Sequence, residues 1–297
     1  MASSQELLNY LSQTQISFDD ARIQYLKKLS DLTNRNTICY YSGWMQKGGY
    51  ANSAIIMDSD MNGFMENVYK LDKSKGLDLI LHTLGGDVTA AEGIGNYLRG
   101  VFGNDIRIIV PQLAMSAGTI LSCIAREILM GKHSSLGPID IQHGEVSIHS
   151  ILEEVGIAKQ EIMVNQASLN FWGDPMIRYP RGFIMHCQKV MELSSELVNC
   201  WLNTGDMFKS DSELVKMAKI ANIMGYFNNS RDRKVHARHI TAKQASEVGL
   251  KIFNLEDEQE LQDAVLSVHH LYMHTLTYTN AIKIIENQDG RRYIQQI

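Results

Sequence analysis

Short apolar runs, each followed by a helical pattern, recur through the first half of the chain. Residues 77–81 and 106–110 are almost wholly apolar, which predicts two strands buried on both faces of a sheet. Between them, from residue 88 to residue 101, apolar side chains recur every three or four positions, so we expect a helix with one buried face. Strand, turn and helix joined by short connections predict a parallel sheet with helices on its faces.

The same pattern predicts elements along the rest of the chain. Strands are expected over residues 37–41 and 127–130, with an edge strand over 250–253. Helices are expected over residues 5–32, 62–70, 119–125, 147–164, 181–202, 212–224 and 261–275. Ser17 and Thr241 are placed to cap helices. The tail that carries Arg291 and Arg292 is expected to be exposed.

The composition is that of an ordinary globular protein. The chain has 297 residues, of which 44% are hydrophobic and 21% charged, so it can bury a substantial core. We expect a helical segment over residues 1–35 and one domain over residues 36–297. A net charge of −5 gives no basic balance for nucleic acid, and no apolar run approaches the roughly 18 residues of a membrane span. Four cysteines without metal-ligand spacing, and a start without a signal-peptide pattern, predict a cytoplasmic protein.

Two short turns carry the candidate chemistry. The sequence His-Thr-Leu-Gly-Gly at 82–86 follows the first buried strand, and Ala-Met-Ser-Ala-Gly-Thr at 114–119 follows the second. A glycine pair at a strand end allows a ligand to approach outward-facing backbone N–H groups. Ser116, between small residues, lies where those groups could face its substrate carbonyl. A hydroxyl beside two N–H donors is what acyl transfer needs.

Around these turns the sequence resembles the serine dehydrogenase proteinase family, which belongs to the larger group of Clp-protease and crotonase folds and is related to signal peptide peptidase A. The resemblance lies in residues 77–86, 109–119 and 130–140, and in 269–287 near the C-terminus. Leu84 and Ile141 stand where the family more often has proline. The resemblance implies an α/β fold of stacked βαβ units with a helical C-terminal layer.

The resemblance also implies an activity and a set of site residues. It implies a cytoplasmic serine endopeptidase that acts on peptide or protein substrates without a cofactor or metal. Ser116 would be the nucleophile, the backbone N–H groups of Gly86 and Ala117 would form the oxyanion hole, and Gly85 would lie against the substrate. Proteins of this fold assemble into trimers or larger rings, so we expect a homo-oligomer, with the apolar helix over 261–275 as a candidate contact.

The group that takes the proton from Ser116 stays open between two candidates. Asp140 stands where the Clp protease subunit has its histidine, so the simple triad order is missing. Relatives of the signal peptide peptidase A type use a lysine, and Lys159 lies at a suitable distance along the chain. Alignment of the later segment with the Clp subunit instead offers His236, which could act together with Asp140. Lys189 is a weaker third option.

Other functions remain alternatives to the peptidase. A crotonase-like acyl-CoA lyase or thioesterase would use a similar pair of N–H groups to hold a thioester enolate. A non-catalytic scaffold would keep the fold and bind peptides. His270 and His274 lie one helical turn apart, but without the glutamate of the zincin pattern they indicate packed histidines rather than metal ligands.

Overall fold

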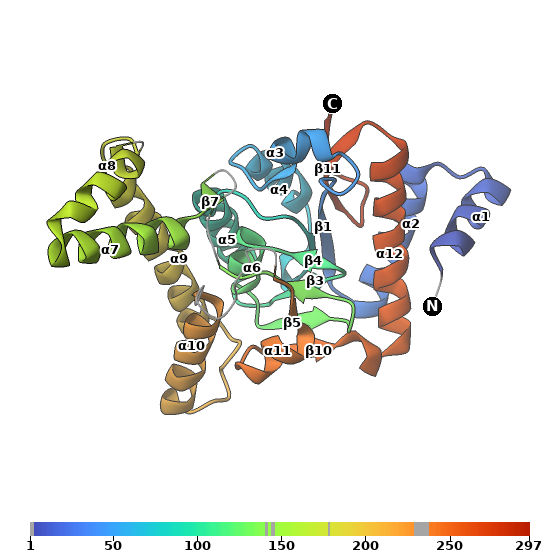
Figure 1. Cartoon of the computed structure of the whole chain (residues 1–297). Coiled ribbons are helices and arrows are strands. Elements are labelled where there is room, and N and C mark those ends of the chain that lie inside the picture. Colours follow the sequence, from blue (N-terminus) through green and yellow to red (C-terminus); the bar gives the residue numbers. More distant parts are fainter. Residues whose placement is uncertain (1–2, 140–141, 144–145, 178, 229–237) are drawn as a thin grey trace.

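A large mixed sheet forms the centre of the molecule (Figure 1). The computed structural model describes residues 3–139, 142–143, 146–177, 179–228 and 238–297. Within these residues, seven strands follow the order β10-β5-β3-β2-β1-β11-β12. Their bounds are β1 (Asn36–Ser42), β2 (Leu77–His82), β3 (Ile106–Val110), β5 (Glu127–Met130), β10 (Ile252–Asn254), β11 (Ala281–Asn287) and β12 (Arg292–Gln296). The first five in spatial order are mutually parallel, whereas β11 and β12 run antiparallel to their neighbours.

Alternation along the central strands divides the core into two layers. In β2, Leu79 and Leu81 belong to one buried cluster, and Ile80 belongs to the cluster on the opposite face. The first face is covered by α4 (Asp60–Val68), α5 (Val88–Phe102), α6 (Ala117–Ser122), α9 (Phe183–Thr204), α10 (Glu213–Asn228) and α11 (Ala242–Glu247). The second face is covered by α2 (Phe18–Thr33) and α12 (Gln259–Tyr278), with α1 (Ser4–Thr14) on α12. The predicted α/β fold is therefore confirmed.

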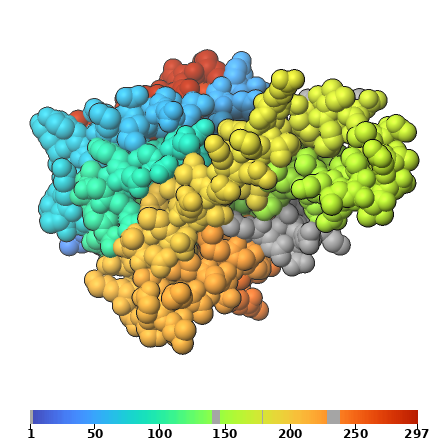
Figure 2. Space-filling model, turned by 90° about the vertical axis from the view of Figure 1, so that its left-hand side faces the viewer, coloured from blue at the N-terminus to red at the C-terminus, as the bar shows by residue number. Residues whose placement is uncertain are grey.

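A small sheet lies at the carboxyl end of the central strands. It consists of β4 (Leu113–Ala114), β6 (Ser135–Leu136) and β9 (Ile240–Thr241), in that order. A two-stranded ribbon, β7 (Gln142–His143) and β8 (Val146–Ser147), leads into a helical arm. This arm, which we define as α7 (Ile148–Val164), α8 (Leu169–Ile177) and the first half of α9, projects from the sheet (Figure 1). Figure 2 shows α9 as a diagonal ridge that joins the arm to α10.

The local sequence patterns predicted most helices and strands at the positions where the structure has them. Ser17 caps α2 by accepting the Asp20 N–H, and Thr241 caps α11 in a capping box with Gln244. The predicted edge strand is β10, at one edge of the main sheet. The helical segment expected over residues 5–32 consists of α1 and α2, which are separated where Gln15 adopts a left-handed conformation and Ser17 begins the second helix.

Two expectations about the C-terminal region need correction. Residues 281–296 are not a free tail but form β11 and β12 in the main sheet, and the two arginines, of which Arg292 is exposed, are ion-paired, Arg291 with Glu66 and Arg292 with Asp19. The apolar side of α12 is not a free contact surface, because it packs against α2 and the sheet. The pattern of apolar residues was correct for α12, but their partner lies within the same chain.

The cysteines of the described residues are all free thiols, and none of the described helices could span a membrane. Cys39, Cys123 and Cys187 are buried, Cys200 is exposed, and all are free of disulfides. Among the helices of the described ranges, none combines the length and the apolar character that a bilayer crossing requires.

Candidate active site

Ser116 lies at a sharp turn between a strand and a helix. It follows β4 and occupies the N-cap position of α6, without a capping bond from its side chain, and has φ +50° and ψ −115°. Two hydrogen bonds with Thr83 fix the preceding strand: Thr83 N–H donates to the Leu113 carbonyl at 3.0 Å, and Met115 N–H donates to the Thr83 carbonyl at 3.0 Å. A positive φ in a residue other than glycine costs about 1–3 kcal/mol and is found where function requires a particular orientation. The turn leaves Ser116 half-exposed at the edge of the sheet.

The glycine turn packs directly against Ser116. Gly85 has φ +107°, and a methyl group placed on it would lie 2.7 Å from the Met115 carbonyl oxygen and 2.8 Å from Ser116 Cβ. The same methyl group would lie 3.2 Å from the Ala117 nitrogen. Only glycine fits at this contact without displacing the backbone. The two turns at residues 82–86 and 114–119 therefore meet, as the sequence analysis expected.

The backbone on either side of Gly86 is hydrogen-bonded to Ile56, a contact that the sequence analysis did not predict. Ile56 N–H donates to the Gly85 carbonyl at 2.8 Å, and Asp87 N–H donates to the Ile56 carbonyl at 2.9 Å. A methyl group on Gly86 would lie 2.4 Å from both the nitrogen and the oxygen of Ile56. No hydrogen bond within the described part of the chain occupies the N–H of Gly86 or of Ala117. Both groups therefore lack an intramolecular acceptor among the described residues, as the donors of an oxyanion hole must.

Residues from the stretch 130–140 pack against Ser116 on the side away from the glycine turn. A methyl group on Gly137 would lie 3.0 Å from the Ser116 nitrogen. Thr119 Oγ1 lies 2.9 Å from the carbonyl oxygens of both Ala114 and Gly137, and it accepts the Gly137 N–H at 3.0 Å. Three of the four stretches that carry the family resemblance, residues 77–86, 109–119 and 130–140, therefore meet at one serine.

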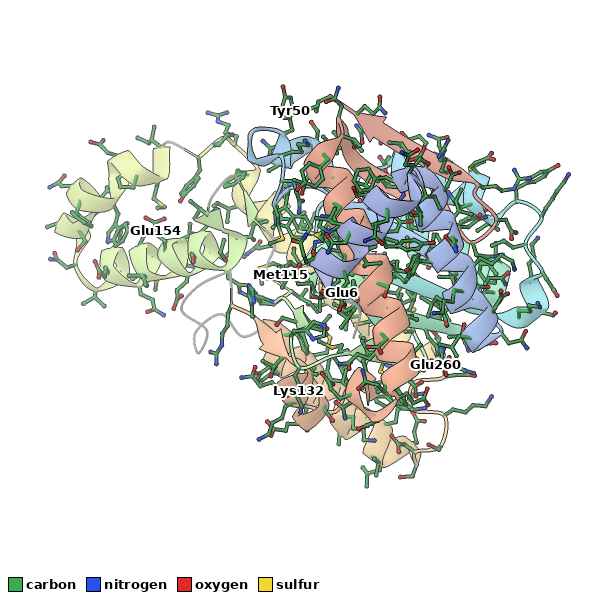
Figure 3. All side chains as sticks on the ribbon, turned by 90° about the vertical axis from the view of Figure 1, so that its right-hand side faces the viewer. Glu6, Tyr50, Met115, Lys132, Glu154 and Glu260 are labelled. Atoms are coloured by element: carbon green, nitrogen blue, oxygen red, sulfur yellow. The ribbon has the colours of Figure 1, made fainter. Side chains whose placement is uncertain are left out.

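The candidate bases do not come together with Ser116 in the described residues. Lys159 is exposed on α7, and Lys189 is exposed on α9. Figure 3 shows Met115 near the body of the molecule and Glu154 out on the arm, and Lys159 follows Glu154 along α7. Asp140 and His236 lie outside the described residues. In the part of the chain that the structure describes, no side chain is hydrogen-bonded to the Ser116 hydroxyl.

Buried histidines form a separate cluster on the α12 side of the sheet. The His82 ring lies 4.6 Å from Trp44, 5.5 Å from Tyr41 and 5.3 Å from His269, measured between ring centroids. Leu113 N–H points to His82 Nδ1 at 3.4 Å, and His82 Nε2 is buried without a hydrogen-bond partner among the described residues. Burial lowers the pKa of His82 to about 3 and lowers that of His269 well below its usual value.

These depressed pKa values predict an acid-sensitive fold. The unfolded chain binds a proton on His82 below about pH 6.5, whereas the folded chain does so only near pH 3, so stability falls as the pH decreases through this window. Between pH 7 and pH 5 we expect His82 alone to account for about 2 kcal/mol of lost unfolding free energy. Urea unfolding of the wild type and of His82→Asn at both pH values measures this difference, and parallel pH dependence in the two proteins would contradict it.

Two histidines of α12 make ordinary hydrogen-bond contacts. His269 Nδ1 lies 3.3 Å from the Tyr41 hydroxyl, and His274 Nε2 lies 2.9 Å from Ser4 Oγ. Across the described ranges, no three His, Cys, Asp or Glu side chains gather in a set that could bind a metal ion.

The fold and the site together define a class of protein: a Clp-protease-like α/β fold in which a strand-end serine faces a glycine turn. Residues 52–171 match the model of the ClpP-like SDH-type serine proteinase family, which confirms the predicted resemblance over this stretch. The matched region contains the glycine turn, Ser116 and Lys159, and it ends before His236.

Two curated relatives match parts of the chain. The uncharacterized protein MJ0137 of Methanocaldococcus jannaschii is 34% identical over 137 residues, which cover 46% of this chain and 48% of that protein. The uncharacterized protein MJ1495 of the same organism is 40% identical over 77 residues, 26% of each chain. The matches thus span about half of the first relative and about a quarter of the second.

Proposed function

We propose that this chain is a serine endopeptidase that hydrolyses peptide bonds through an acyl-enzyme on Ser116. One observation carries the proposal. Gly85 packs so closely against Ser116 Cβ and the Ala117 nitrogen that a side chain on it would not fit, and no hydrogen bond among the described residues occupies the N–H groups of Gly86 and Ala117. The family match over residues 52–171 supports the same chemistry.

The proposed reaction proceeds in two steps. Ser116 Oγ attacks the substrate carbonyl carbon while its proton passes to a base, and the carbonyl oxygen becomes an oxyanion. The N–H groups of Gly86 and Ala117 stabilise that charge, which is the dominant contribution in many acyl-transfer enzymes. The peptide amine leaves with a proton, and water then hydrolyses the acyl-enzyme to regenerate the serine.

As the base we propose His236 acting with Asp140, and we keep Lys159 as the alternative. Two contacts between described neighbours of these residues support the pair. Ile139 N–H donates to the Phe227 carbonyl at 3.1 Å. The strand β9, shortly after His236, pairs with β6, whose next residue Gly137 lies against Ser116. A lysine base must lose its proton, which burial favours, and Lys159 is exposed.

Covalent labelling tests the proposal. We expect a fluorophosphonate probe to label the wild-type chain at one serine, which peptide mass spectrometry would identify as Ser116, and the label to be absent in Ser116→Ala. Ser122→Ala, which changes a buried serine on α6 bonded to the Gly118 carbonyl, is the matched control and should label normally. Acyl-CoA turnover that persists in Ser116→Ala would favour the crotonase-like alternative instead, and peptide binding without labelling would favour the scaffold.

We also propose that the chain works as a homo-oligomer, a trimer or a larger ring. Exposed apolar side chains on the arm support a contact between subunits there. They include Val164 at 90%, Ile177 at 82%, Met163 at 77% and Phe171 at 70% exposure. Such a surface is typical of protein contacts rather than of a solvated helix.

A further inference from the structure

A buried ion pair lies behind the segment that faces Gly86. Lys283 on β11 and Asp60 at the start of α4 are joined by a 2.7 Å contact between Nζ and Oδ1, and both side chains are fully buried. Removing two charges from water costs free energy that an apolar pair of similar size does not. Packing alone therefore does not account for this pair.

The pair holds both ends of a three-residue segment. Lys283 Nζ donates to the Ile55 carbonyl at 2.7 Å. Met57 N–H donates to Asp60 Oδ2 at 3.1 Å, and the Tyr40 hydroxyl donates to the same oxygen at 2.8 Å. The backbone on each side of Ile56 is thus anchored to a buried charge, and such charge-assisted bonds are stronger than neutral ones.

Ile56 in turn fixes the glycine turn. It accepts the Asp87 N–H and donates to the Gly85 carbonyl, in a parallel bridge opposite Gly86. In an extended segment, successive backbone groups point to opposite sides. Because the groups that flank Gly86 point to Ile56, the N–H of Gly86 itself points away from Ile56. From the other side, Gly85 N–H donates to Thr83 Oγ1 at 3.1 Å.

We propose that the Lys283–Asp60 pair is a positioning pair for the oxyanion hole. It fixes Ile55 and Met57 and, through Ile56, keeps the Gly86 N–H directed at the substrate oxygen beside Ser116. This inference rests on the proposed function of Ser116. Neither side chain touches the substrate, so the pair acts through backbone geometry, which oxyanion stabilisation requires to be set before the reaction.

A second buried pair on the same strand provides a matched control. Arg22 Nε lies 2.8 Å from Glu286 Oε2, with both side chains fully buried, and Tyr272 donates to the same carboxylate. Glu286 is three residues from Lys283 on β11, but it faces α2 and α12 instead of α4. The Arg22–Glu286 pair is therefore as buried as the Lys283–Asp60 pair and also has one member on β11, but it makes no contact with residues 55–57.

The test compares two charge-neutral double variants. The first is Lys283→Met with Asp60→Asn, and the second is Arg22→Met with Glu286→Gln. Asp60→Asn alone, which keeps the shape of the side chain, is a further variant should the first double variant fail to fold. Hydrogen–deuterium exchange of residues 84–88 measures the turn directly, and hydrolysis of a quenched fluorescent casein measures the reaction.

In the first double variant we expect faster amide exchange in the glycine turn and a lower kcat. The Asp87 amide, which is bonded to Ile56, should exchange at least about 10-fold faster than in the wild type and in the control variant. Casein kcat should fall about 10- to 100-fold with KM changed by no more than about twofold. Affinity for a peptide boronate, which places a negative oxygen in the hole, should fall in parallel with kcat.

Each contrary result has a distinct meaning. Unchanged exchange at 84–88, or an increase no larger than in the control variant, overturns the positioning role while leaving the Ser116 proposal intact. Lower thermal stability with unchanged kcat per folded molecule also overturns it, because a merely structural pair would behave in this way. Wild-type hydrolysis that survives Ser116→Ala would instead overturn the proposed function, and with it the catalytic meaning of the pair, whatever the exchange shows.

Discussion

Ser116→Ala is expected to lower the rate of casein hydrolysis at least about 1,000-fold, because the acyl-enzyme cannot form without the serine oxygen. The residual rate would come from the oxyanion hole and from substrate binding alone. The fold should be kept, since alanine has the same Cβ as serine and the Ser116 hydroxyl makes neither a capping bond to α6 nor any other hydrogen bond within the described residues. Steady-state kinetics with quenched casein, together with a thermal unfolding curve, measure both parts of the expectation.

The serine on the next helical turn provides the control for this result. Ser122 Oγ donates to the Gly118 carbonyl at 2.8 Å inside α6, away from the glycine turn. Ser122→Ala should therefore keep kcat within about twofold of the wild type while losing about 1 kcal/mol of stability for the hydrogen bond. Equal activity of Ser116→Ala and Ser122→Ala would show that Ser116 is not the nucleophile.

The central part of this site followed from the sequence for a physical reason. Carboxyl ends of neighbouring parallel strands meet at one edge of a sheet, so turns after β2 and β3 had to lie close together. Gly85, Gly86 and Ser116 occupy those turns, and the close packing of Gly85 against Ser116, which leaves no room for a side chain at position 85, is the consequence. Short turns with small residues leave little freedom, which is why this prediction needed no knowledge of distant contacts.

The C-terminal strands could not be predicted in the same way. Lys283 and Glu286 lie on opposite faces of β11, so the segment shows neither the continuous apolar run of a buried strand nor clean alternation. Both charges are nevertheless buried, because Asp60 and Arg22 neutralise them from more than 200 residues away in the chain. A local pattern contains no information about such partners, and no strand was therefore predicted over residues 281–287.

The general base could not be predicted from the sequence, because its position relative to Ser116 also depends on contacts between residues far apart in the chain. A spacing of 43 residues between Ser116 and Lys159 says nothing about the direction in which the intervening helix runs. In the structure α7 belongs to the arm, where Ile148 and Ile151 pack against Phe183 and Cys187 of α9 rather than on the sheet. The assignment of a base by distance along the chain is therefore weaker than the assignment of the nucleophile from the turn in which it lies.

Gly86→Ala is expected to reduce kcat about 100- to 1,000-fold, which is the effect of removing one oxyanion donor. The added methyl group would lie 2.4 Å from the nitrogen and the oxygen of Ile56, and Gly86 has φ +152°, where an L side chain is strained. The turn must move to relieve this contact, and the bonds of Ile56 to Gly85 and Asp87 would then be lost. We expect about 1–3 kcal/mol of lost stability as well, so kinetics should be measured well below the unfolding midpoint.

A helical glycine separates this effect from that of an added methyl group in general. Gly100 lies in the interior of α5, and a methyl group there would meet no atom within 4 Å. Gly100→Ala should therefore raise stability by about 0.5–1 kcal/mol and leave kcat unchanged. In Gly86→Ala, KM should change far less than kcat, because the lost donor acts on the oxyanion rather than on the bound peptide. A folded Gly86→Ala enzyme with wild-type kcat would mean that the oxyanion is held by groups other than the Gly86 N–H.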